Sequence, residues 1–116
     1  MADDSFKDYV LDQLRGLGRV EARAMFGGHG LYHAGLFFGV VYGGRLYFKT
    51  DEATRQGYVQ LGMGPFQPNE KQTLWTYYEV PADILEDDEA LTLWAEQACQ
   101  VARSAGEAED TLEGEP

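Results

Sequence analysis

The stretch of sequence that decides the fold is LFFGVVY-GG-RLYFK, residues 36–49. Its two halves, residues 36–42 and 45–49, are rich in aromatic and β-branched residues, which favour strands. The pair Gly43-Gly44 between them is a two-residue connector of the kind found in tight hairpins. The stretch therefore predicts two antiparallel strands joined by a short turn.

Further strands flank this hairpin. Residues 19–26 alternate between small apolar and charged side chains, which is typical of a half-buried strand. The glycine-rich segment Gly27–Gly30 then predicts a turn, and Leu31 begins the next strand. Residues 62–69 have the composition of a loop, and residues 73–80 have strong strand propensity. Three or four consecutive strands are thus followed by one or two more.

Helices are predicted at both ends of the chain and in the middle. Ser5 is a candidate N-cap for the first helix, and Asp51 is a candidate N-cap for a second helix from Glu52 to about Leu61. The last helix is expected to end at Gly106, where a C-terminal glycine cap belongs. The apolar stripes of the first and last helices are formed by Phe6, Tyr9, Val10, Leu14 and Leu17, and by Leu91, Trp94, Ala95, Ala98, Cys99 and Ala102.

This order of elements predicts an α+β fold. Sequential strands joined by short turns form an antiparallel sheet, and amphipathic helices cover its apolar face. The expected architecture is a two-layer sandwich whose sheet is mainly antiparallel. The sequence predicts one folded domain, residues 1–105, and an acidic disordered tail, residues 106–116.

Composition restricts the function. The chain of 116 residues has nine Lys and Arg against twenty Asp and Glu, a formal net charge of −11. Direct DNA binding needs clustered cations, so this charge argues against it. No apolar run approaches the roughly 18 residues of a membrane-spanning helix. The acidic N-terminus and the single cysteine, Cys99, favour a cytoplasmic protein over a secreted one.

Several residues that could carry chemistry have simpler explanations. His29 lies in the predicted turn and His33 on the strand after it, without acidic neighbours, so solvated or hydrogen-bonded imidazoles are expected instead of a metal site. The glycines of Gly27–Gly30 lack the following helix that a phosphate-binding loop needs. Cys99 belongs to an apolar stripe and is expected to be a buried hydrophobe. No catalytic residue, metal or cofactor is predicted.

An interaction surface is the alternative to a reactive centre. Arg23, Arg45 and Lys49 lie on predicted strands and could form a small basic spot, or could simply pair with nearby acids such as Glu21. Half of the strand aromatics must face away from the helix layer, because strand side chains alternate. Tyrosine and tryptophan on such a face suit a protein interface. The strand tyrosines and tryptophan are Tyr32, Tyr42, Tyr47, Trp75, Tyr77 and Tyr78.

The segment AMFGGHGLY, residues 24–32, resembles the N-terminal domain of the TfoX/Sxy proteins, regulators of competence genes in bacteria. The resemblance continues in GRLYFKTD (residues 44–51), in Pro65-Phe66 and in YYEVP (residues 77–81), and it covers about residues 3–104. It implies an α+β fold similar to that of secretion chaperones. It also implies a role in transcriptional regulation of DNA uptake, exerted through another protein.

The function expected from these observations is that of a non-enzymatic protein–protein interaction module of the TfoX N-terminal type. One alternative is a homodimeric, chaperone-like protein that binds a client. Another is a small-ligand binder or enzyme that uses the Gly27–Gly30 turn. The residues expected to contact a protein partner are Arg23, Met25, Phe26, Gly27, Gly28, Tyr32, Lys49, Tyr77 and Tyr78.

Overall fold

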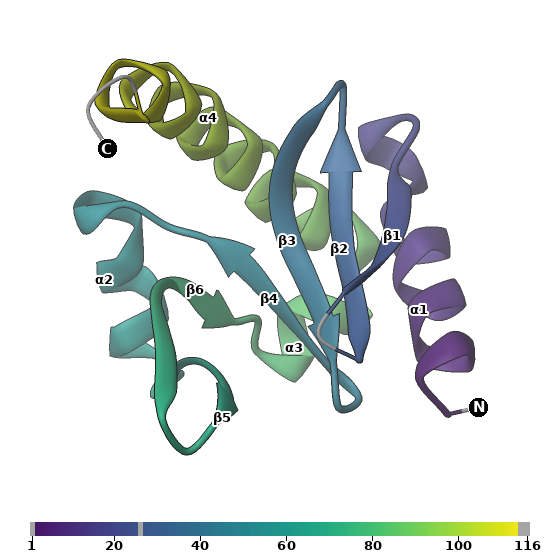
Figure 1. The fold of residues 1–116 in the computed structure, drawn as a ribbon. Coiled ribbons are helices and arrows are strands. Elements are labelled where there is room, and N and C mark those ends of the chain that lie inside the picture. Colours follow the sequence, from purple (N-terminus) through teal and green to yellow (C-terminus); the bar gives the residue numbers. More distant parts are fainter. Residues whose placement is uncertain (1, 26, 114–116) are drawn as a thin grey trace.

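A computed structural model describes the backbone of residues 2–25 and 27–113 and the side chains of residues 5–25 and 27–105. Its centre is a six-stranded sheet in which every neighbouring pair is antiparallel, in the order β1-β2-β3-β4-β6-β5 (Figure 1). The strands are β1 (Glu21–Met25), β2 (Gly28–His33), β3 (Leu36–Tyr42), β4 (Arg45–Lys49), β5 (Pro65–Asn69) and β6 (Gln72–Glu79).

The helices form the second layer. They are α1 (Ala2–Gln13), α2 (Glu52–Gln60), α3 (Ala82–Glu86) and α4 (Asp88–Glu113), with a short 3-10 turn, η1 (Arg15–Leu17), after α1. Figure 1 shows α4 crossing behind β2 and β3. All four helices contribute side chains to one apolar core against a single face of the sheet. The predicted α+β sandwich with an antiparallel sheet is confirmed.

Local signals predicted several elements well. The hairpin of β3 and β4 turns at Gly43-Gly44, where both residues have positive φ. Asp51 caps α2 by accepting a hydrogen bond from the Thr54 backbone N–H at 2.8 Å, and the Thr54 hydroxyl accepts one from the Asp51 N–H. These hydrogen bonds, chiefly the one from Thr54, hold the pKa of the Asp51 carboxyl below its usual range.

Two expectations about the N-terminal half are wrong. Ser5 lies inside α1, which begins at Ala2, so it cannot be the cap, because a capping residue has non-helical backbone. The glycine turn is also shorter than predicted: Gly27, with a φ of +84°, lies in the connection, but β2 begins at Gly28 and includes Gly30. Gly28 and Gly30 are needed because neighbouring atoms approach each of them closely, as described for the candidate site.

Two expectations about the C-terminal half are also wrong. The predicted loop at residues 62–69 contains β5, which pairs with β6 despite its prolines, because an edge strand tolerates proline. Helix α4 continues past Gly106 to Glu113 instead of ending at that glycine. The division into a folded domain, residues 1–105, and a disordered tail, residues 106–116, remains a prediction.

A β-bulge in β3 decides which side chains face the helices. Leu31 of β2 pairs with Gly39 and Tyr32 pairs with Phe37, so Phe38 has no partner in β2. Phe38 is fully buried in the core that the helices cover, whereas Phe37 lies on the other face. Gly39 also faces the helix side, where a Cβ atom would lie 3.2 Å from the Phe48 ring. The bulge thus lets the consecutive residues Phe38 and Gly39 both face the helix side, while ordinary alternation puts Phe37 on the other face.

Within the residues that the structure describes, no helix has both the length and the apolar character that crossing a membrane requires.

Candidate interaction site

The face of the sheet that the helices leave uncovered has a small apolar core of its own. This second core contains Val40, Tyr47, Phe66 and Tyr77 as buried residues, and none of its members comes from a helix. Phe66, on the edge strand β5, packs its ring 4.7 Å from that of Tyr47 and 5.3 Å from that of Tyr42 on β3. In a flat sheet β3 and β5 would be about 14 Å apart. The β5–β6 hairpin therefore bends over this face.

The Tyr42 hydroxyl fixes the bend. It donates a hydrogen bond to the Pro68 carbonyl oxygen at 3.2 Å, so β3 holds the strand that lies over it. Beside the bent hairpin, the same face continues towards β1 without a helix above it. Five of the residues that the sequence predicted for partner binding belong to this face of the sheet, namely Arg23, Met25, Tyr32, Lys49 and Tyr77.

Four of those residues form, together with Phe37, a continuous line of ring contacts, which we call the cation–aromatic row. The Arg23 guanidinium lies 4.2 Å from the Tyr32 ring centre, and Tyr32 stacks on Phe37 at 5.1 Å. Phe37 lies 5.4 Å from Tyr77, whose ring is 5.1 Å from the Lys49 ammonium. The row crosses the sheet from edge strand β1 to β6 and has a cation at each end. A cation over an aromatic face is attracted to its negative charge density.

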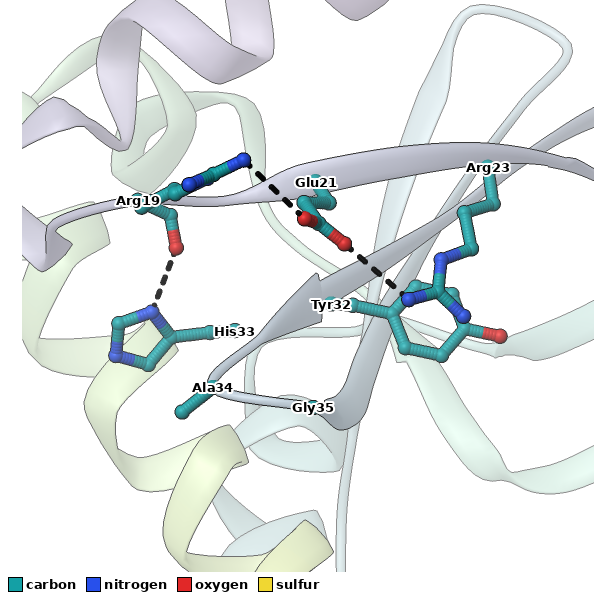
Figure 2. Close-up of a pocket in the computed structure, with 7 residues that line it drawn as sticks. All are labelled: Arg19, Glu21, Arg23, Tyr32, His33, Ala34 and Gly35. Atoms are coloured by element: carbon teal, nitrogen blue, oxygen red, sulfur yellow. Dashed lines mark hydrogen bonds and ion pairs between the residues drawn. The ribbon is translucent and has the colours of Figure 1, made fainter.

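One end of the row borders a surface pocket of about 360 Å³ (Figure 2). Glu21 lies between two arginines there, 3.6 Å from the Arg19 guanidinium and 3.2 Å from that of Arg23. His33 donates from Nδ1 to the Arg19 carbonyl oxygen at 2.8 Å. The pocket is completed by the β2–β3 connection, Ala34-Gly35, whose positive φ angles suit a tight hairpin turn.

The predicted basic spot is only partly assembled. Arg23 pairs with Glu21, and Arg45 donates to the Glu79 carboxylate at 3.0 Å. Exposed ion pairs of this kind contribute about 0–1 kcal/mol, so they orient the arginines more than they stabilise the fold. The Tyr32 ring gives the Arg23 side chain a second support. Arg23 is therefore held in place while its side chain stays 59% exposed.

Met25 also belongs to the uncovered face. A Cβ atom on Gly30 would lie 2.9 Å from the Met25 methyl group and 3.0 Å from the Phe37 ring, so both side chains cover this glycine. A Cβ atom on Gly28 would lie 2.2 Å from the Val41 carbonyl oxygen. These contacts fill the space beside Gly28 and Gly30. The pocket of Figure 2 lies at the other end of the β1–β2 hairpin.

Two of the tyrosines predicted for partner binding are buried. Tyr78 lies in the core that the helices cover, with its ring 6.2 Å from that of Tyr58 on α2, so its predicted surface position is wrong. The alternation of β6 sends Tyr77 to the opposite face, where it supports the row but is only 6% exposed. Gly27 is exposed in its turn, and Phe26 lies outside the described residues.

The sequence did not single out Phe37, the centre of the row. It stands between Leu36 and Phe38 in an apolar run, and both of these neighbours belong to the helix-covered core. The alternation of strand side chains separates Phe37 from Leu36 and Phe38. The sequence could not show on which face of the sheet Phe37 lies, because the apolar run does not reveal which face the helices cover.

The single cysteine is not a reactive group in this structure. Cys99 is 6% exposed on the apolar side of α4, and burial, as the largest cause, raises the pKa of its thiol to about 11. This agrees with the expected role of a small buried hydrophobe. Among the residues whose side chains are described, no three His, Cys, Asp or Glu residues are grouped to hold a metal ion.

The buried thiol gives a direct test. At pH 8 the native protein is expected to react with a thiol reagent at least about a hundredfold more slowly than a free cysteine, because little thiolate is present and the sulfur is covered. The rate should rise with pH up to about 11, where the thiol ionises. The urea-unfolded protein is the control and should react at the free rate. Equal rates for native and unfolded protein would contradict the buried position of Cys99.

The fold and the site define a small α+β domain with helices on one face of its sheet and a largely open aromatic surface on the other. The family model described as TfoX N-terminal domain matches residues 12–102 of the chain. The match covers well over half of the sequence, and the chain belongs to this family. A search among curated proteins gives no significant match.

Proposed function

We propose that this domain is a non-enzymatic protein–protein interaction module that acts in the transcriptional regulation of competence, and hence of DNA uptake, in the bacterial cytoplasm. Membership of the TfoX N-terminal domain family supports the regulatory role. The domain acts through a protein partner and does not grip DNA itself, since a net charge of −11 opposes contact with the phosphate backbone.

The cation–aromatic row is the observation that carries the proposal. Tyrosine and arginine are the residue types that most often dominate binding energy at protein interfaces. Tyr32 and Phe37 are half-buried, so each keeps part of its ring accessible to a partner. Their neighbours in the row already fix the two rings, so binding a partner costs these side chains less conformational entropy. Arg23 and Lys49 at the ends add charges that fix the orientation of the partner.

The proposal is tested with a photoreactive phenylalanine analogue placed at one position at a time. At Phe37 the probe replaces an aromatic ring in the row, whereas at Leu93, 65% exposed on α4, it reports on the helix side. In cells undergoing competence development, the probe at Phe37 should attach covalently to a partner that the probe at Leu93 does not reach. Equal capture from both positions would contradict the proposed surface.

Point variants connect the surface to the function. Arg23→Ala and Tyr32→Ala should each weaken binding of the captured partner about tenfold or more. Both should lower transcription from a competence-gene reporter, while the exposed control Lys71→Ala leaves it unchanged. Unchanged transcription in both row variants would refute the regulatory role. A titration with duplex DNA at low salt checks the indirect mechanism, which tight and steeply salt-dependent binding would overturn.

A further inference from the structure

The two edges of the sheet differ in their capacity to accept another strand. The outer strand β5 contains Pro65 and Pro68, and its pairing with β6 is interrupted by register shifts. Proline cannot donate a backbone hydrogen bond, so β5 is a protected edge. Strand β1 contains no proline and pairs with β2 over five consecutive residues without a shift. In the described part of the chain, no other strand pairs with the outer side of β1.

The side chains of β1 alternate between charged and small residues. The register with β2 places Glu21 and Arg23 on the uncovered face, beside Tyr32 and Gly30. Ala22 and Ala24 lie on the helix side. A second copy of β1, placed antiparallel about a two-fold axis through Ala22, would set each Glu21 directly opposite the partner's Arg23. Opposite charges at such cross-strand positions attract each other.

The charge pattern also excludes the neighbouring registers. Centring the axis on Glu21 would oppose the two Glu21 side chains and place Arg19 opposite the partner's Arg23. Centring it on Arg23 would oppose the two Arg23 side chains. Like charges directly opposite one another are destabilising, so among registers centred on a residue of β1 only the one on Ala22 sets both Glu21 and Arg23 opposite a charge of the other sign. A register centred on Val20, outside the strand, would pair Arg19 with the partner's Glu21 but would leave Arg23 without an acid opposite it. On the other face the register centred on Ala22 brings only Val20 and alanines together, which leaves room for close strand pairing.

The helix layer leaves this edge accessible. Helix α1 enters the core through Val10, and Leu14, directly after the helix, is also fully buried. The strand contacts of α1 are mainly with β3. Ala24, near the end of β1, is exposed. We infer that two copies of this chain associate through antiparallel pairing of their β1 strands about a two-fold axis at Ala22. The two six-stranded sheets then become one continuous sheet with both helix layers on the same side.

This dimer does not depend on the partner-binding role proposed above. Its contact is short, because β1 has only five residues. Interfaces of this size are characteristic of weak, reversible complexes. The dimer is therefore sought by sedimentation equilibrium over a concentration series from about 10 µM to about 1 mM, the range in which weak complexes dissociate.

Charge reversal tests the register. Glu21→Arg sets a new cation opposite Arg23 across the axis, and Arg23→Glu opposes two acids, so each variant alone should raise the dimer dissociation constant about tenfold or more. The double variant Glu21→Arg/Arg23→Glu restores both attractions and should dimerise like the wild type. Glu70→Arg and Lys71→Glu are matched controls, since they carry the same kind of charge reversal in the exposed turn between β5 and β6.

The decisive measurement is an equimolar mixture of the two single variants. In the mixed pair each arginine of one chain faces a glutamate of the other, so a heterodimer should form with about the wild-type affinity although each variant alone dimerises more weakly. Repulsion within each chain persists in the mixture, so only contact between chains can restore association. The inference is overturned if the wild type stays monomeric up to about 1 mM, beyond the affinity range of weak complexes, if the variants dimerise normally, or if the mixture stays monomeric. Circular dichroism confirms that each variant is folded.

Discussion

Replacing Gly28 by alanine is expected to lower the free energy of unfolding by about 3 kcal/mol or more, the range of severe overpacking. The added methyl group would lie 2.2 Å from the Val41 carbonyl oxygen and 3.2 Å from the Tyr42 Cα. These are backbone atoms of β3, which cannot move away without breaking the pairing of β2 with β3. Urea denaturation measures the loss.

The control for this prediction is the same chemical change at Gly57, inside α2. A Cβ atom there has no neighbour within 4 Å, and the residue is helical. Gly57→Ala should therefore raise the free energy of unfolding by about 0.5–1 kcal/mol, because alanine favours the helix. The two substitutions have opposite expected signs. If Gly28→Ala were as stable as the wild type, the close approach of β2 to β3 would be wrong.

Replacing Phe66 by alanine should cost about 3–5 kcal/mol of stability, as for other fully buried aromatic residues. Phe66 is 0% exposed, although it comes from an edge strand, because the β5–β6 hairpin bends over the sheet. Its loss would remove the contacts with Tyr42 and Tyr47 that hold the bend. Thermal and urea unfolding both measure the effect.

The matched control is Trp75→Ala, since this ring is 63% exposed in the same hairpin. It should change the free energy of unfolding by less than about 1 kcal/mol, as is usual for exposed positions. A similar loss for both variants would mean that the hairpin does not cover the face. The Phe66 variant should also weaken partner capture by the probe at Phe37, because Tyr77 supports both the second core and the row.

The sequence predicted the elements whose signals are local. Asp51 and Thr54 are three residues apart and cap α2, and Gly43-Gly44 closes its hairpin without any help from distant residues. Strand β5 could not be predicted in this way. Its two prolines lower strand propensity, and the pairing comes from β6, with the ring of Phe66 fixed against β3 and β4.

The candidate site was half predicted. Arg23, Tyr32 and Lys49 were named because cations near aromatic residues on strands suggest an interface, and the structure places all three in one row. Which of Tyr77 and Tyr78 faces the row depends on which side the helices cover, and this is a tertiary property. Phe37 was hidden for the same reason, and the bulge at Phe38 cannot be recognised in a run of apolar residues.

The unpaired residue in β3 has a consequence for how the domain can diverge. Phe38 is buried beneath the helices, while Phe37 contributes to the open surface. Two consecutive residues therefore have separate roles, one in folding and the other in recognition. Substitutions at position 37 can retune which molecule is recognised while the packing at position 38 is preserved. Deleting Phe38 would remove a core ring without moving the later side chains of the strand to other faces, because Phe37 and Gly39 already face opposite sides.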